Sequence, residues 1–340
     1  MAEISQLEET TAIALEFVIG VSGHRDTLPE DEIELKKHVT EVLVEVKNSF
    51  TDLPCRVVTG LAEGADTLVT EVAMDLGMKV SAVLPMPKDE YEKDFDGAAK
   101  DRFLACLADE RLTVHELPVV EENLEADISS GEVRVAQYEA LMDFLVRRSN
   151  IILALWDGKV LESKGGTYDV ISSFLSGHAQ HQAPSKIDGS GPMFEDFGDL
   201  AVWVKTRRKS GSDELHAGKA TFLVSDSSGM VYSDMTNIPE QFLARWHGFE
   251  AYASARYSDE AEAISCWPLI DGGSEDASPQ AVAIDQEFMR ADQLAMSNQS
   301  YSDNLFKAFG LIAGAMGLLF LVYAKLSALK SFLWLYVALM

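Results

Sequence analysis

Cysteine is scarce in this chain of 340 residues: only Cys55, Cys106 and Cys266 occur, far apart in the sequence. An odd and scattered set excludes a disulfide framework and a cysteine-rich zinc site, and it is typical of a reducing cytosol. His178 and His181 have the spacing of a metal-binding pair, but no nearby carboxylate or cysteine completes such a site. We therefore expect no metal and no resident cofactor.

Positive charge is scarce as well. The chain has 28 Lys and Arg against 55 Asp and Glu, which gives a formal net charge of −27. A surface of this sign repels the phosphates of nucleic acid and of anionic lipid. The sequence thus predicts no nucleic-acid partner, and a phosphate-bearing ligand would need a place where positive potential is concentrated locally.

The N-terminus, MAEISQLEETT, lacks the apolar stretch of a signal peptide. Together with the cysteine usage, this leads us to expect the N-terminal region in the cytoplasm. Residues 308–324 near the C-terminus carry no charge. With the two apolar residues at 305 and 306, and with Lys307 free to snorkel, the run reaches the ~20 residues that cross a bilayer core.

We therefore expect a transmembrane helix over about 305–324 in the inner (cytoplasmic) membrane, with a long buried core helix as the alternative. A second apolar run at 332–340 is too short to cross as a helix, so a hairpin would be incomplete.

Apolar runs alternate with helical patterns through the first 206 residues. Continuous apolar runs that end on glycine or proline are typical of buried parallel strands, and a period of about 3.6 residues is typical of helices. We expect strands at 16–23, 56–59, 80–84, 112–117, 151–156 and 201–205. We expect helices up to about residue 48 and at 67–76, 98–108, 133–148 and 167–175. This order predicts an α/β fold, a doubly wound and mostly parallel Rossmann-like sheet with helices on both faces.

The pattern changes after residue 206. A hairpin of 221–225 with 230–233 is expected, then a helix over 239–258, a linker at 271–280 and a helix over 281–300. The predicted parts are a nucleotide-binding domain (1–206), a small α+β extension with linker (207–280) and a helical membrane segment (281–340). Arg207, Arg208 and Lys209 are expected to form a solvated loop.

Three glycine-bearing turns follow predicted strands: GVSGHRD (20–26), TGLAEGAD (59–66) and WDG (156–158) with KGGTYD (164–169). Glycines let backbone N–H groups approach a phosphate, and the helix that follows adds its positive end. In an open α/β sheet such turns meet beyond the carboxyl ends of the strands. The expected ligand-binding residues are Gly20, Ser22, Gly23, His24, Arg25, Thr59, Gly60, Glu63, Gly64, Asp66, Asp157, Gly165, Gly166 and Thr167.

Each turn alone also has a plain structural interpretation. His24 and Arg25 could be solvated side chains of a tight turn, and Asp66 could cap the helix after it. Three such turns at strand ends of one sheet favour a shared nucleotide site.

The ordered motifs GVSGHRD, TGLAEGAD and RSNIILALWDG with KGGT resemble the SLOG superfamily, over about residues 14–206. This Rossmann-like group includes the DNA-processing protein DprA and the LOG-type nucleotide hydrolases. A shorter segment, residues 290–295 before the apolar run, is similar to the SLATT-type membrane effectors often fused to SLOG domains. The resemblance implies a bacterial, often antiviral, signalling system in which a sensor domain binds a nucleotide-derived messenger.

The hydrolase branch of that family carries a longer signature, PGGxGTxxE. Here Lys164 replaces its proline, one residue between the glycines and Thr167 is missing, and the acid is Asp169. These departures favour sensing over hydrolysis.

Our leading hypothesis is a membrane-anchored, oligomeric sensor that couples nucleotide binding to membrane disruption. The alternative is a nucleotide-processing enzyme that cleaves an N-glycosidic or phosphoester bond, with Glu63 or Asp169 as its carboxylate. A tail-anchored binding module without effector activity is a third possibility.

Overall fold

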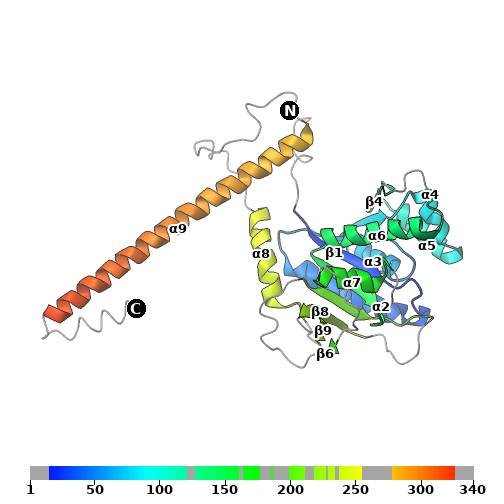
Figure 1. Ribbon diagram of the computed structural model, residues 1–340, viewed down its shortest axis with the longest axis horizontal. Helices are drawn as coiled ribbons and strands as arrows, with labels where there is room; N and C mark the ends of the chain where they lie inside the picture. The colour runs from blue at the N-terminus through cyan, green and yellow to red at the C-terminus, as the bar shows by residue number, and fades with distance from the viewer. Residues whose placement is uncertain are drawn as a thin grey trace. The chain divides into compact units, whose positions relative to one another are not determined.

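A computed structural model gives the arrangement of the chain (Figure 1). It describes residues 15–120, 127–160, 164–176, 185–186, 199–210, 218–226, 229–233, 237–254 and 278–325. The chain divides into two units, residues 15–254 and a second unit of residues 1–14 with 255–340.

The first unit is built on one mixed sheet, which has nine strands within the described residues, in the order β4-β3-β2-β1-β5-β7-β8-β9-β6. Six strands from β4 to β7 run parallel. They are β1 (Phe17–Gly23), β2 (Cys55–Thr59), β3 (Lys79–Leu84), β4 (Leu112–Glu116), β5 (Ile151–Trp156) and β7 (Ala201–Lys205). The strand order reverses between β1 and β5, as in a doubly wound fold. The predicted Rossmann-like sheet is confirmed.

Helices cover both faces of the sheet. One face carries α2 (Glu32–Ser49), α3 (Ala65–Asp75), α5 (Gly97–Leu107) and α8 (Glu240–Ser254), and the other carries α6 (Gly131–Arg148) and α7 (Thr167–Ser176). Short helical turns, η2 (Pro29–Asp31), α4 (Lys88–Tyr91) and η3 (Glu92–Asp94), lie in the connections.

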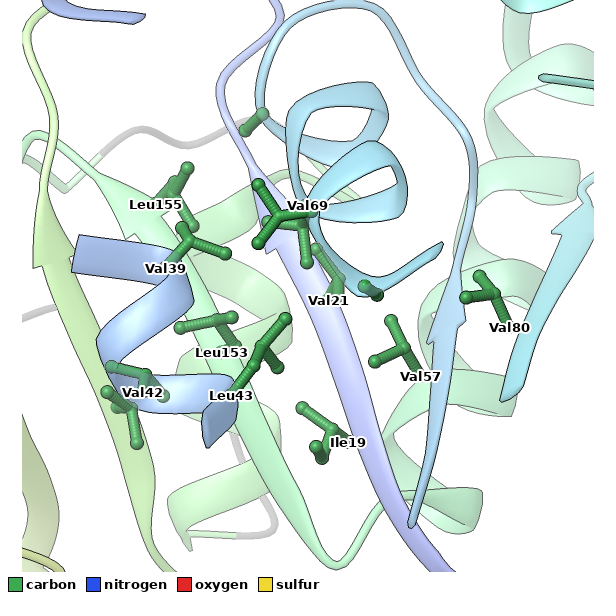
Figure 2. Close-up of a cluster of buried hydrophobic side chains, with 14 of the residues drawn as sticks. Ile19, Val21, Val39, Val42, Leu43, Val57, Val69, Val80, Leu153 and Leu155 are labelled. Atoms are coloured by element: carbon green, nitrogen blue, oxygen red, sulfur yellow. The ribbon is translucent and has the colours of Figure 1, made fainter. Parts of the chain in front are cut away.

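Successive side chains along each strand point to opposite faces of the sheet. Ile19 and Val21 of β1 join the cluster that includes Val39 and Leu43 of α2 and Val69 of α3, all buried (Figure 2). On β5, Leu153 and Leu155 belong to that same cluster, whereas Ile152, Ala154 and Trp156 pack toward α7. Every residue of β5 is apolar and buried, because both faces of the strand are covered, as in parallel sheets generally.

The hairpin predicted after residue 206 continues the same sheet. Strands β8 (Ala220–Asp226) and β9 (Gly229–Ser233) pair with each other, and β8 pairs antiparallel with β7. The short strand β6 (Ser185–Lys186) pairs with β9. Strands β8 and β9 therefore extend the Rossmann-like sheet at its edge.

The described part of the second unit is one long helix, α9 (Pro279–Lys325). The transmembrane helix predicted over 305–324 falls within it. Among the residues that the structure describes, no helix combines the length and the apolar character needed to cross a membrane. The predicted span is thus not found, and the side chains at 319 and 321–325 lie outside the described residues, as does the whole run 332–340.

Candidate functional site

A cavity of about 750 Å³ lies where the connections after β1, β2, β5 and β7 meet α6 and the turn around η3. This is the edge of the sheet formed by the carboxyl ends of the parallel strands, at the point where the strand order reverses. Open α/β sheets bind their ligands at this place. A volume of this size is typical of small-molecule sites.

Eight of the residues predicted to bind ligand line this cavity. They are Ser22, Gly23, His24, Arg25, Asp66, Gly165, Gly166 and Thr167. The first and third glycine turns therefore contribute most of their predicted residues, and the second contributes Asp66.

The other six predicted residues lie elsewhere. Gly20 is inside β1, where its missing side chain makes room for Ser149 and Ile152. Thr59 and Asp157 are buried and do not line the cavity. The carbonyl of Gly60 accepts a hydrogen bond from the Tyr91 hydroxyl at 3.1 Å. Glu63 and Gly64 line a smaller neighbouring pocket of about 250 Å³. Residues in one sequence motif thus face two different spaces.

The first two turns are fastened to each other through their backbones. The N–H of Ala65 donates to the carbonyl of His24 at 3.1 Å. A Cβ on Gly23 would lie 2.3 Å from the Cβ of Ala65, and one on Gly64 would lie 2.4 Å from the carbonyl oxygen of Arg25. Gly64 also has a φ of +81°, which side chains disfavour. These glycines therefore serve close packing of the two turns.

His24 links the β1 turn to the β5 turn. Its Nε2 accepts a hydrogen bond from the N–H of Asp157 at 3.1 Å and lies 3.0 Å from Oδ1 of the same residue. Burial would raise the pKa of Asp157, but its interaction with the His24 side chain and the hydrogen bond from the N–H of Lys159 lower it overall. Both side chains are buried. His24 is thus a positioning residue that connects neighbouring strand ends, in contrast to the solvated side chain of the plain interpretation.

Asp66 is the most buried carboxyl group of the cavity wall. Burial raises its pKa to about 7, while hydrogen bonds from the turn after β2 and the charge of Arg25 act against that rise. The N–H of Ala62 donates to its Oδ2 at 3.4 Å. Asp66 therefore changes protonation state near neutral pH at the edge of the cavity, a property suited to proton transfer or to a switchable hydrogen bond.

The third turn approaches α6 closely. Gly165 has a φ of +71°, and a Cβ there would lie 3.2 Å from the backbone of Tyr138. Its N–H donates to Oδ2 of Asp169 at 3.1 Å, so this carboxylate holds the turn together. The turn places Gly166 and Thr167 at the N-terminus of α7, where the helix presents its positive end.

A second group of cavity residues was missed by the sequence analysis. Asp94 accepts hydrogen bonds from Nη2 of Arg134 at 2.6 Å and from the Tyr138 hydroxyl, and it lies 3.9 Å from Nη2 of Arg25. The guanidinium of Arg25 sits 5.4 Å from the centre of the Tyr138 ring. Arg134 and Tyr138 are four residues apart on α6, a spacing that puts them on one helix face. That spacing was the only signal in the sequence.

The loop after β7 also reaches the cavity. Arg208 and Ser210 line it, and the side chain of Arg207 pairs with the buried Asp31. The expectation of a solvated basic loop is therefore wrong: carboxylates of the β1–α2 connection hold this loop in place.

Basic residues outnumber acidic residues in the lining of the cavity, which is the opposite of the balance in the whole chain. Five basic side chains line it, Arg25, Arg134, Lys159, Lys164 and Arg208, against three carboxyl groups, Asp26, Asp66 and Asp94. The whole chain has about twice as many acidic as basic residues. Positive potential is thus concentrated where the glycine turns meet, which favours an anionic ligand.

No family model matches the chain, and no curated protein matches it. Among solved structures, it is similar to DNA processing protein A (DprA) from Streptococcus pneumoniae, with 17% identity over 41% of this chain and 41% of that one, at a TM-score of 0.28. DNA processing protein A from Helicobacter pylori is 14% identical over 53% of this chain and 71% of that one, with a TM-score of 0.30. The protein TM1055 is 17% identical over 47% of this chain and 82% of that one, with a TM-score of 0.25.

The chain thus spans less than half of the length of the Streptococcus pneumoniae protein. At these identities the likeness extends to the fold alone. The Helicobacter pylori structure is described by its single-stranded DNA binding mode. The prediction that excluded nucleic acid is wrong in its reasoning, because net charge averages over the chain whereas the cavity gathers basic groups.

Proposed function

We propose that the cavity binds a phosphate-bearing nucleotide and that the first unit acts as a sensor of it. The observation that supports this most is the excess of basic side chains in the cavity of a strongly acidic chain. The N-terminus of α7 and the glycine turns beside it supply backbone groups suited to phosphate. The partly exposed ring of Tyr138 lines the cavity and offers apolar surface to a base.

Sensing is favoured over turnover by the position of the two carboxylates that hydrolysis would use. Glu63 lines the neighbouring pocket and not the cavity, and Asp169 accepts the N–H of Gly165 in the turn itself. A ligand that orders the turns after β1 and β5 shifts the conformational equilibrium by its differential affinity for the two states.

Nucleotide hydrolysis is the second candidate, and one observation favours it. Asp66 lines the cavity and has a pKa of about 7 because of its burial, as a general acid or base would need near neutral pH. In this form of the proposal, Asp66 takes the role that the sequence analysis gave to Glu63 or Asp169.

A thermal-shift screen of the full chain against cyclic nucleotides, cyclic ADP-ribose isomers and NAD tests the proposal. We expect one of them to raise the Tm of the wild-type chain and to have a much smaller effect on Arg25→Ala. The matched control is Arg147→Ala, an exposed arginine of α6 that is not among the cavity residues. Product formation during the screen, detected by chromatography, would favour the hydrolase. If no compound raised the Tm of the wild-type chain, or if a compound raised the Tm of Arg25→Ala and of Arg147→Ala equally, the assignment of the site would be contradicted.

The finer form of the proposal follows the family resemblance: the nucleotide is a second messenger of a bacterial defence system, and the second unit is its membrane effector. The full chain added to dye-loaded liposomes would then release dye only together with the nucleotide found in the screen. Dye release without ligand, or none with it, would contradict this form and leave nucleotide binding untouched.

A further inference from the structure

The connection that follows β7 takes part in the cavity although no glycine turn lies in it. The N–H of Thr206 donates to the carbonyl of Trp156 at 2.9 Å, which holds the end of β7 beside the end of β5. Two and four residues later, Arg208 and Ser210 line the cavity. The ends of β1, β5 and β7, three adjacent parallel strands, thus surround one part of this space.

Asp26 fixes the geometry of this connection. Its Oδ1 accepts from Nε of Arg208 at 2.8 Å, its Oδ2 accepts from Oγ of Ser210 at 2.5 Å, and its carbonyl accepts from the N–H of Lys209 at 2.8 Å. Thr27 forms a β-bridge with Arg208. Asp26 follows Arg25 directly, so the same turn that carries the first cavity arginine also orients the second.

Arg208 differs from Arg134 in the number of carboxylates with which its guanidinium pairs. Arg134 pairs with both Asp94 and Glu90. Within the described part of the chain, Arg208 has one carboxylate partner, Asp26, whose bond is to Nε. A guanidinium held in this way keeps a planar pair of Nη donors for a second anion, and a phosphate matches that geometry.

We propose that Arg208 binds the phosphate group of the ligand between the ends of β1, β5 and β7. This assignment rests on the proposed nucleotide site and deepens it, because it separates the recognition of phosphate from that of the nucleoside. Phosphate is recognised at the β7 connection, and the nucleoside at the side of the cavity that Tyr138 lines.

The test compares three probes on the full chain by isothermal titration calorimetry: AMP, adenosine and inorganic phosphate. We expect Arg208→Ala to weaken the binding of AMP and of phosphate at least about tenfold and to leave adenosine binding within about twofold, since a charge-assisted hydrogen bond is lost only to phosphate. Arg208→Lys keeps the charge without the planar donors. We expect its affinities for AMP and for phosphate to lie between those of the wild type and of Arg208→Ala.

Lys209→Ala is the matched control. It removes the same charge one residue away, where the side chain lines the smaller pocket, and it keeps the backbone N–H that bonds to Asp26. We expect its affinities to equal those of the wild type. An equal loss of affinity for AMP and phosphate in Lys209→Ala and Arg208→Ala would show that the effect comes from general electrostatics. That result would overturn the assignment.

Two further outcomes separate this inference from the function on which it rests. The wild-type chain could bind AMP with an affinity that Arg25→Ala weakens and that Arg208→Ala and Arg208→Lys leave unchanged. That result would overturn the role of Arg208 and keep the nucleotide site. Failure of AMP and of phosphate to bind the wild-type chain would contradict the assignment of phosphate to Arg208, and together with a negative thermal-shift screen it would contradict the nucleotide site as well. The Tm of each unliganded variant shows whether the loop remains folded, and Arg208→Lys gives the answer if Arg208→Ala does not.

Discussion

The carbonyl oxygen of His24 accepts the N–H of Ala65 at 3.1 Å, so the turn that ends β1 and the turn that begins α3 are one backbone assembly. Nothing larger than hydrogen fits at the contact: a Cβ on Gly64 would lie 2.4 Å from the Arg25 carbonyl oxygen. The wall of the cavity is therefore set by main-chain atoms on this side, and side chains add to it from α6 and from the β7 connection.

Gly64→Ala tests that close approach. We expect it to lower the free energy of unfolding by more than ~2 kcal/mol, because the backbone at φ +81° is strained for alanine and the new methyl group also meets the Arg25 carbonyl. Gly77→Ala is the control, since Gly77 has a φ of +65° but no atom within 4 Å of its Cβ position. It should cost only ~1 kcal/mol. Urea denaturation measures both, and equal losses would show that the contact between the turns contributes nothing.

Asp66 gives the protein a pH-dependent stability. The folded-state pKa of about 7 lies above the ordinary value of 3.8, so the unfolded chain releases this proton first. The stabilisation is complete below about pH 4 and is lost as the pH rises to about 7, a change on the order of 3 kcal/mol. Asp66→Asn has no such titration. Its Tm, measured from pH 4 to 8, should rise relative to that of the wild type as the pH increases, whereas parallel curves would mean that Asp66 ionises normally.

Tyr138 and Asp94 should be energetically coupled. Tyr138→Phe removes the hydroxyl that donates to Asp94 but keeps the ring on which Arg25 rests. A double-mutant cycle of Tyr138→Phe with Asp94→Asn, followed by chemical denaturation, should give a coupling energy of ~1–2 kcal/mol. Additive losses would show that the hydroxyl and the carboxylate act independently, and the network around the cavity would then be loose.

Arg207 and Asp31 form a partly buried ion pair that holds the β7 connection to the β1–α2 connection. Nε of Arg207 donates to Oδ2 of Asp31 at 2.8 Å, and the Asp31 side chain is only 6% exposed. Arg207→Ala leaves this carboxylate buried without its arginine, so we expect a loss of ~3 kcal/mol in the free energy of unfolding.

Arg147→Ala is the matched control for that variant, because Arg147 pairs with Asp143 on the exposed surface of α6, where its side chain is 78% exposed. We expect it to change the free energy of unfolding by less than ~0.5 kcal/mol. Similar values for the two arginines, measured in urea, would argue against a structural role for Arg207.

The strands of the parallel sheet were predictable because burial on both faces leaves an unbroken apolar run, as in Ile151–Trp156. The glycine turns were predictable as well, since positive φ and close packing demand glycine at positions such as Gly64 and Gly165. The order of strands then brings the first and third turns to one cavity.

Other site residues had no local signature. Arg134 and Tyr138 belong to the cavity only because α6 crosses the sheet beside β1, and Arg208 only because Asp26 holds it. Conversely, Glu63 and Gly64 share a motif with Asp66 but face the neighbouring pocket, because α3 begins at Ala65, between Gly64 and Asp66. Where a side chain points after a turn depends on the tertiary packing, which neither composition nor spacing records.

The antiparallel pairing of β8 with β7 has an evolutionary consequence. Strand β7 ends, and β8 begins, at the edge of the sheet where the cavity opens, so the chain between them can gain or lose residues without disturbing any parallel strand pair. Related proteins could therefore acquire new ligand preferences by changing the length and sequence of this one connection, while the older scaffold of strands and glycine turns stays as it is.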